Sequence, residues 1–338
     1  MRGVMPAQRY VDNPNMRKAS NPIRMLAELL VEAVLIGLVV AGALILAYFP
    51  YSSDAGLSEE EMQKTRDYYA EAYKAPPKEE PDTPQSERYV KIATEAANEV
   101  NVDGLVRSFV ADYGLAGKHV LEVGSGRGNL QDLVEDYTGL DISSSVSRFY
   151  HKPFVLGSAT AMPFPDNSFD AVWTVWVLEH IPAPEQTLRE IRRVVKPGGH
   201  IFMMPAWNVT PFVANGYHVR PYSDLSIKGK AIKASIVPWS YFYILAQGGI
   251  RPVRYEWWKL AGGPTTFRYR RLDPNYETYW EPDSDAINSL DRFETALWFT
   301  SRGDSWLNQT SEDMSELAGP VVLKVNKPDS AATSAARR

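Results

Sequence analysis

The sequence predicts an α/β fold built on a doubly wound, mostly parallel sheet, and three observations support this prediction. From Lys118 onward, short apolar segments alternate with segments of helical periodicity, as in parallel strands joined by helices on both faces. A glycine-rich turn follows the first strand, and an aspartate ends the next one. These features indicate a ligand site at the carboxyl edge of the sheet.

Composition narrows the function classes. The chain has 338 residues, of which 44% are hydrophobic and 23% charged, which excludes collagen-like, coiled-coil and wholly disordered proteins. A net charge of -5 gives no electrostatic basis for nonspecific nucleic-acid binding. Because the chain has no cysteine, disulfides, thiolate nucleophiles, iron–sulfur clusters and cysteine-ligated zinc are excluded, and no metal site is expected.

The N-terminal segment predicts a membrane anchor. Residues 1–24 form a basic tail, and residues 33–49 are uncharged, which corresponds to about 25 Å of helix. With the preceding turns included, residues 25–49 are expected to be a transmembrane helix, so that a membrane is one predicted partner. A cleaved secretory signal and a buried core helix are the alternatives.

The segment 50–85 is predicted to be a charged helix followed by a proline-rich linker. A capping-box pattern at residues 58–61 opens the helix, and four prolines from residue 76 onward end it. The anchor would thus be a tether, and the globular domain would cover residues 86–326, beginning with one or two amphipathic helices. The remaining tail, 327–338, is expected to be disordered.

The clearest local signal is an apolar strand at residues 119–123 that runs into a turn containing Gly124, Gly126 and Gly128. Glycines let the backbone turn tightly and approach a ligand closely, and a following helix would point its N-terminus at that ligand. A nucleotide-like ligand is therefore expected. Asn129 breaks the dinucleotide spacing, and the Gly-Lys-Ser/Thr ending of an ATP-binding loop is missing.

Four more motifs follow in order. Asp141 ends the next predicted strand, where a carboxylate can accept hydrogen bonds from both hydroxyl groups of a ribose. After it come the segments 157–172, Val177–Ile181 and Arg193–Gly199. With these five motifs, residues 118–206 resemble the class I S-adenosylmethionine-dependent methyltransferases, specifically the small-molecule, type 11-like group with Pro-Phe-x-Asp-x-Ser-Phe-Asp and Leu-Glu-His signatures.

The resemblance implies a Rossmann-like sheet of seven strands, S-adenosyl-L-methionine as cofactor, and a cofactor site. In that site Glu122, Gly124, Ser125, Gly126 and Gly128 would shape the pocket for the methionine part, Asp141 would hold the ribose, Ile142 and Met162 would pack on adenine, Ser158 and Ala159 would face its edge, and Val177 would lie beneath the sulfonium. Ser158 departs from the family, in which an aspartate is common. Structural alternatives stay open for Glu122 and Asp141 as turn or helix caps, and for Met162 as core packing.

The acceptor is expected to be a small, hydrophobic or lipid-like molecule, because the insertion at about 207–306 is rich in aromatic residues. A well-packed second layer explains the same composition equally well. Strand six is predicted at residues 251–259, and strand seven at either 295–300 or 320–325. His180 is the candidate base or acceptor contact and His218 a weaker one, each with a structural role as the alternative.

Two other function classes remain at this stage: an inactive, membrane-tethered scaffold on the same fold, and a nucleic-acid methyltransferase, against which the lack of an Asn/Asp-Pro-Pro-Tyr/Phe motif argues. The basic tail places the domain outside the cytosol by the positive-inside rule. The cofactor is made in the cytosol, and on that ground a cytosol-facing domain is favoured. The sequence names neither the acceptor nor a protein partner.

Overall fold

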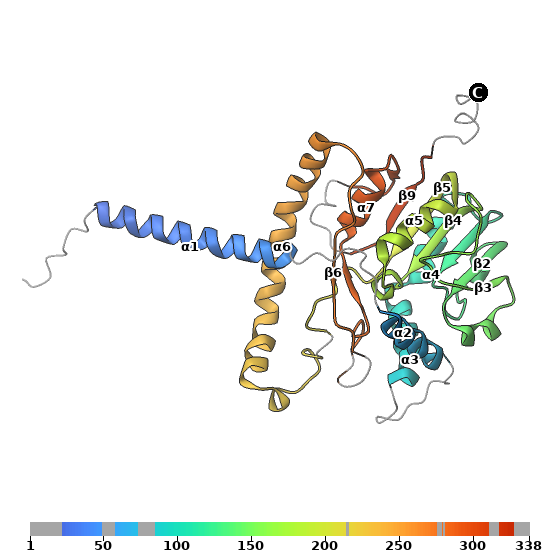
Figure 1. Ribbon diagram of the computed structural model, residues 1–338, viewed down its shortest axis with the longest axis horizontal. Coiled ribbons are helices and arrows are strands. Elements are labelled where there is room, and N and C mark those ends of the chain that lie inside the picture. The colour runs from blue at the N-terminus through green and yellow to red at the C-terminus, as the bar shows by residue number, and fades with distance from the viewer. Residues whose placement is uncertain are drawn as a thin grey trace, which may run out of the picture.

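The computed structural model describes residues 22–48, 58–73, 85–213, 216–275, 279, 281–310 and 318–327 (Figure 1). Its α-helices are α1 (Pro22–Tyr48), α2 (Glu59–Ala72), α3 (Gln85–Val100), α4 (Val102–Asp112), α5 (Pro184–Val194), α6 (Ile227–Ala261) and α7 (Arg292–Thr300). Its strands are β1 (His119–Val123), β2 (Asp136–Asp141), β3 (Phe154–Leu156), β4 (Phe169–Val175), β5 (Val195–Met204), β6 (Tyr269–Arg271), β7 (Asn288–Leu290), β8 (Ser305–Trp306) and β9 (Val321–Lys324). Most of the predicted basic tail, the proline-rich linker and the C-terminal tail lie outside the described residues.

The main sheet has seven strands in the order β3-β2-β1-β4-β5-β9-β8. Strands β1 to β5 pair in parallel, whereas β9 pairs antiparallel with both β5 and β8. The predicted doubly wound, mostly parallel seven-stranded sheet is therefore confirmed. Strands β6 and β7 form a separate antiparallel pair.

The sheet has a hydrophobic core on each face, as its uninterrupted apolar strands require. Leu121 and Val123 of β1 belong to the core beneath α5 and α7, to which Trp298 and Phe299 contribute their buried rings. On the opposite face, Val120 packs with the buried residues of α4. Four of the aromatic residues in the predicted acceptor insertion, Phe267, Tyr269, Trp298 and Phe299, thus belong to the core of the sheet.

Capping side chains fix where the covering helices begin. Asp291 accepts a hydrogen bond from the N–H of Glu294 at the start of α7, and Asn101 does the same for Gly104 in α4. Helix α5 begins at Pro184, in a position where a missing N–H costs nothing.

Two predicted elements are wrong, the strand at residues 251–259 and the helix after the glycine turn. Residues 251–259, predicted as a strand, lie in α6, because Arg251, Arg254 and Trp258 recur at helical spacing on the face that packs against the protein. Residues 295–300 lie in α7, so the alternative at 320–325, where β9 is found, is confirmed. The helix expected after the glycine turn is reduced to the 3-10 turn Gln131–Leu133, because β2 begins at Asp136 and leaves no room for it.

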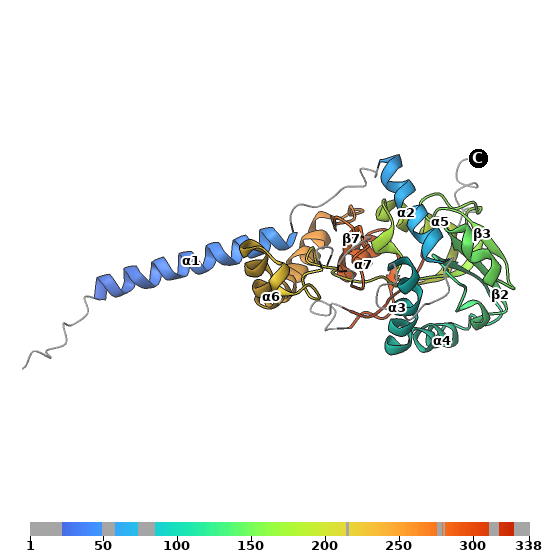
Figure 2. The ribbon, with the colours of Figure 1, turned by 90° about the horizontal axis from the view of Figure 1, so that it is seen from below.

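The predicted transmembrane helix at 25–49 is not confirmed. Helix α1 forms over Pro22–Tyr48, and its side chains are exposed as far as Leu38. Within the described part of the chain, no helix combines the length and the apolar character that crossing a membrane requires. In Figures 1 and 2, α1 projects away from the sheet and contacts α6.

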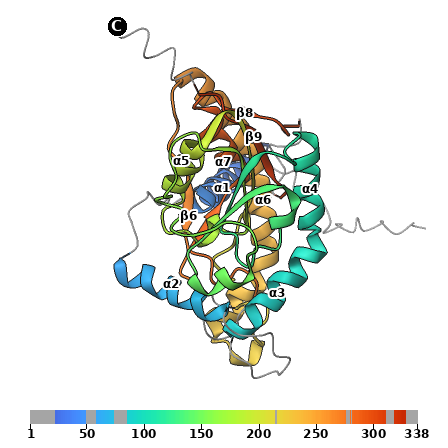
Figure 3. The ribbon, with the colours of Figure 1, turned by 90° about the vertical axis from the view of Figure 1, so that its right-hand side faces the viewer.

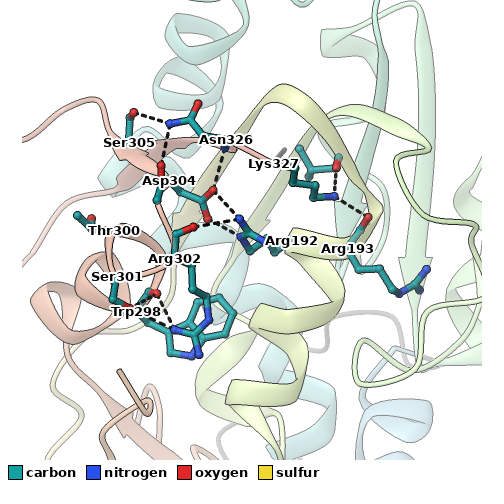
Figure 4. Close-up of polar contacts among 12 residues, drawn as sticks. Arg192, Arg193, Trp298, Thr300, Ser301, Arg302, Asp304, Ser305, Asn326 and Lys327 are labelled. Atoms are coloured by element: carbon teal, nitrogen blue, oxygen red, sulfur yellow. Dashed lines mark hydrogen bonds and ion pairs between the residues drawn. The ribbon is translucent and has the colours of Figure 1, made fainter. Parts of the chain in front are cut away.

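A buried polar network joins α5 to the C-terminal strand. Arg192 makes two hydrogen bonds to the carboxylate of Asp304, which also accepts from the N–H of Asn326 (Figure 4). Beside them, the ammonium of Lys327 donates to the side-chain oxygen of Asn167 and to the carbonyls of Arg193 and Val195. Burial beside Arg192 lowers the pKa of Lys327 to about 8. The network holds the residues after β9 against the start of β5.

Candidate functional site

A cavity of about 270 Å³ opens at the carboxyl ends of β1, β2 and β4. Gly124 and Asp141 contribute to its floor, immediately after and at the end of their strands. Helices α2 and α3 lie together over this edge (Figure 3) and supply Tyr69, Tyr73 and Tyr89 to the cavity wall. The chain thus encloses the site that the strand pattern predicts, and one of the helices that enclose it, α2, lies in the segment 50–85 that the sequence places outside the globular domain.

The glycine turn has the conformation that its sequence predicts. Gly124, Gly126 and Gly128 all have positive φ, at 69°, 48° and 68°, which side chains rarely tolerate. A Cβ on Gly124 would lie 2.3 Å from Cγ2 of Val177, and both residues line the cavity. A Cβ on Gly126 would lie 3.0 Å from the hydroxyl of Tyr73. The turn therefore admits no side chain at Gly124 without displacing the cavity wall.

Asp141 holds this turn in place. Its Oδ2 accepts from the N–H of Gly126 and its Oδ1 from the N–H of Ser143, both at 2.8 Å. Burial raises the pKa of Asp141, while these backbone donors oppose that rise. Each carboxylate oxygen keeps a further acceptor site, because a carboxylate accepts about four hydrogen bonds. Asp141 can therefore cap the backbone and bind a hydroxyl-bearing ligand at the same time.

Glu122 lies apart from the cavity wall. Its buried Oε2 accepts a 2.5 Å hydrogen bond from the hydroxyl of Tyr137. Burial raises the pKa of Glu122 to about 8, although the bonds from Tyr137 and Trp173 oppose the rise. Tyr150 connects this pair to the turn, since its hydroxyl donates a hydrogen bond to Ser125 Oγ at 2.7 Å. Glu122 and Ser125 thus support the turn from behind.

The remaining predicted cofactor residues divide into two groups. Ile142, Ser158 and Ala159 line the cavity, on the side where β2 and β3 end. Met162 is buried in the hydrophobic core and does not line the cavity, which is the placement expected if its role is core packing. Gly128, at the end of the turn, does not line the cavity, and a Cβ on it would lie 2.8 Å from the ring of Tyr150.

A second, largely apolar cavity of about 370 Å³ adjoins the first. The two share Tyr89, Ala93, Trp176 and His180, so these residues form the boundary between them. Trp176 has a φ of 53°, an unusual conformation for a bulky residue, and its N–H donates to the carbonyl of Met204. Backbone strain thus marks the residue that separates the two cavities.

His180 lies at this boundary among carboxylates. Its Nδ1 is 3.6 Å from Oδ2 of Asp285, and its Nε2 is 3.8 Å from Oε1 of Glu179. Burial on its own would lower the pKa of His180, but Asp285 and Glu179, with a contribution from Asp283, outweigh it and raise the pKa. The hydroxyl of Tyr69 donates to Asp285 Oδ2 at 2.9 Å and so orients that carboxylate.

His218, the weaker histidine candidate, lies outside both cavity walls. It is partly exposed, and its Nδ1 lies 2.8 Å from a carboxylate oxygen of Glu281. The geometry brings together His180 and the cavity residues but leaves His218 in a surface ion pair.

The tyrosines of α2 and α3 and the partner of His180 are residues of the cavity region that no sequence motif identifies. Tyr69 and Tyr73 stand four residues apart, on one face of a helix, and this spacing is a signal that they pack against something. Tyr69 packs edge-on to His180, with ring centroids 5.8 Å apart. Asp285 carries no motif, and only the tertiary fold brings it to His180.

Comparison with known proteins finds similarity to methyltransferases. The family described as "Methyltransferase domain" matches residues 121–203. The "Ubiquinone/menaquinone biosynthesis C-methyltransferase UbiE" of Hahella chejuensis is 31% identical over 136 residues, covering 35% of this chain and 55% of that protein. The "Demethylmenaquinone methyltransferase" of Symbiobacterium thermophilum is 30% identical over 203 residues, covering 51% of this chain and 81% of that protein.

A third relative, the "2-methyl-6-phytyl-1,4-hydroquinone methyltransferase" of Synechocystis sp., is 39% identical over 105 residues, covering 27% of this chain and 33% of that protein. In the Hahella and Synechocystis comparisons the chain thus spans 55% and 33% of the relative's length.

Proposed function

The chain belongs to the S-adenosylmethionine-dependent methyltransferase family, and we propose that it transfers a methyl group to a hydrophobic, ring-bearing small molecule. The observation that carries the proposal is the pair of adjoining cavities. One is built around the glycine turn and Asp141, the other is apolar, and His180 lies where they meet.

The first cavity suits S-adenosylmethionine. The cradle at Gly124, which a Cβ would fill, leaves room for a ligand beside Val177. Asp141 offers acceptor sites for ribose hydroxyls, and Ile142 and Ala159 offer apolar surface for adenine. The cofactor supplies an electrophilic methyl group on a sulfonium when bound. Since S-adenosylmethionine is made in the cytosol, the proposal places the domain there.

The second cavity suits an apolar acceptor. It extends from Trp176 and Met204 to Trp207 and Ala93, all with apolar side chains. The quinone-related names of the relatives support a ring acceptor of this kind. An acceptor ring beside His180 would have its apolar part in this cavity and its reacting atom toward the first, as in-line displacement requires.

His180 is the proposed proton acceptor. A phenolic or quinol hydroxyl becomes a better nucleophile, at oxygen or at a ring carbon, as it loses its proton. Asp285 stabilises the imidazolium that then forms, and Tyr69 fixes Asp285 through its hydroxyl. Burial raises the pKa values of Tyr73 and Tyr89, so these phenols stay neutral near pH 7 and serve as packing surfaces.

The test has two separate measurements on the purified full chain. Calorimetry with S-adenosylmethionine is expected to show binding, and incubation with methyl-labelled cofactor and reduced demethylmenaquinone is expected to label the quinone. Gly124→Val is the negative control for binding, because its side chain would collide with Val177. Absence of cofactor binding contradicts the proposed function, whereas binding without labelling of any reduced quinone contradicts the acceptor class.

A further inference from the structure

Helix α6 has two different faces. Toward the protein, Arg251 pairs with Asp291 at 2.6 Å and Arg254 with Glu294 at 3.0 Å, and Gln247 is buried. These residues fix the helix against α7 and the residue that caps it. These ion pairs all lie on the side of α6 that faces α7 and its capping residue.

The outer face of α6 is apolar and exposed. In its C-terminal part the exposed apolar residues are Val253, Trp257 and Leu260, with exposed fractions of 68%, 67% and 85%, and Ile227 at its first turn is 89% exposed. Val253, Trp257 and Leu260 follow the i, i+4, i+7 spacing of a single helical stripe. Single exposed apolar residues are ordinary on protein surfaces, but a stripe along one helix marks an interaction surface.

The charge that accompanies this stripe is positive. With Arg251 and Arg254 paired to carboxylates of α7 and its cap, α6 retains four lysines and a single acidic residue, Glu256. Lys228 and Lys230 are exposed near its first turn, whereas Lys259 in its last turn pairs with Glu256 at 2.6 Å. Lysines beside an apolar stripe that includes tryptophan are typical of helices that lie in the headgroup region of a bilayer.

We propose that the outer face of α6 docks on a lipid bilayer that carries anionic headgroups. The apolar stripe would enter the boundary between headgroups and acyl chains, and the lysines would lie against the anionic phosphates. A second copy of the chain fits less well, because identical faces would bring lysines against lysines. Helix α1, which exposes its apolar side chains over residues 22–38, contacts α6 and projects away from it and from the sheet (Figure 1).

The absence of cysteine from the chain permits a direct test. A single cysteine at Trp257→Cys is labelled with an environment-sensitive fluorophore in the full chain, and Leu307→Cys, an exposed apolar position after β8, is the matched control. Vesicles of phosphatidylcholine mixed with phosphatidylglycerol are expected to shift the emission of the label at position 257 to the blue and to leave that at 307 unchanged.

The charge contribution is measured separately. Lys228→Gln combined with Lys230→Gln is expected to weaken binding to the anionic vesicles by about fivefold for each charge removed. Three results would overturn the proposal. Two are the absence of a blue shift at position 257 and an equal shift at position 307. The third is a blue shift that appears without vesicles as the protein concentration rises, which would assign the face to contact with a second copy. None of these readouts depends on methyl transfer.

Discussion

Asp141 combines a structural position and a place in the wall of the first cavity in a single carboxylate. It holds the N–H groups of Gly126 and Ser143, and it also lines the first cavity. Its place beside the glycine turn was predictable from sequence because the turn and the strand end are local features that are only 15 residues apart. The partner of His180 was not predictable, since Asp285 lies 105 residues further along the chain.

Replacing Asp141 by alanine is expected to weaken the binding of S-adenosylmethionine by about 1.5 to 3 kcal/mol, which corresponds to the loss of a charge-assisted acceptor. Part of this loss comes from release of the Gly126 N–H, which leaves the turn less ordered. Calorimetry on the variant and on Asp136→Asn, an exposed residue at the start of the same strand, provides the comparison. Equal affinity in Asp141→Ala and the unchanged protein would remove Asp141 from the cofactor site.

Replacing Asp285 by asparagine is expected to change the pH dependence of turnover. The carboxylate favours the charged imidazolium, so its removal lowers the pKa of His180, and the neutral base then forms at lower pH. The acidic limb of kcat/KM against pH should move down by about one unit. Glu179 and Asp283 still face the ring in this variant, so part of the elevation of the His180 pKa remains.

The matched control for the pH profile is Glu281→Gln, which breaks the ion pair with His218 outside both cavities. Its profile should coincide with that of the unchanged protein. A profile for Asp285→Asn that keeps its acidic limb would show that His180 does not titrate in the reaction.

At the scale of elements, side-chain pairing decides what local pattern leaves open. Residues 251–259 contain aromatic and β-branched side chains that favour a strand, yet they are helical. The helix is stabilised by Arg251 and Arg254, whose partners lie in α7 and its cap, 40 residues away. By contrast, β1 was predictable, because an apolar strand covered on both faces needs no distant partner to be recognised, whereas β9 was one of two alternatives that the sequence left open.

The network between α5 and the C-terminal strand predicts a large effect on stability. Asp304→Ala is expected to lower the free energy of unfolding by about 3 kcal/mol, because Arg192 is then left partly buried without its carboxylate and the N–H of Asn326 loses its acceptor. The comparison is Asp166→Ala, whose side chain is 70% exposed in its pair with Arg193 and whose loss should cost below about 0.5 kcal/mol. Urea unfolding measures both values, and similar losses would contradict the assignment of the network to the fold.

At the scale of the whole molecule, the site is assembled from segments that the sequence had assigned to separate domains. The sheet supplies the glycine turn and Asp141. Helix α2, which lies outside the domain predicted over residues 86–326, supplies Tyr69 and covers the cavity. Hydrogen bonds to the backbone of α2 and of the residue after it help to hold the helix: Ser143 and Ser145 donate to the carbonyls of Tyr69 and Ala70, and Arg148 donates to that of Tyr73. Charge and capping patterns identify such a helix, but they do not show what it covers.

Binding of S-adenosylmethionine is therefore expected to slow hydrogen exchange in α2 as well as in the glycine turn. Helix α2 packs on α3 and covers the cavity, and a ligand beneath Tyr69 adds contacts that oppose opening of the helix. Mass spectrometry of peptides from residues 58–73 measures this, with peptides from α7 as the internal control, since α7 packs in the core away from the cavity. Protection confined to the sheet would show that the cofactor binds without contacting α2, and α2 would then not be part of the cofactor site.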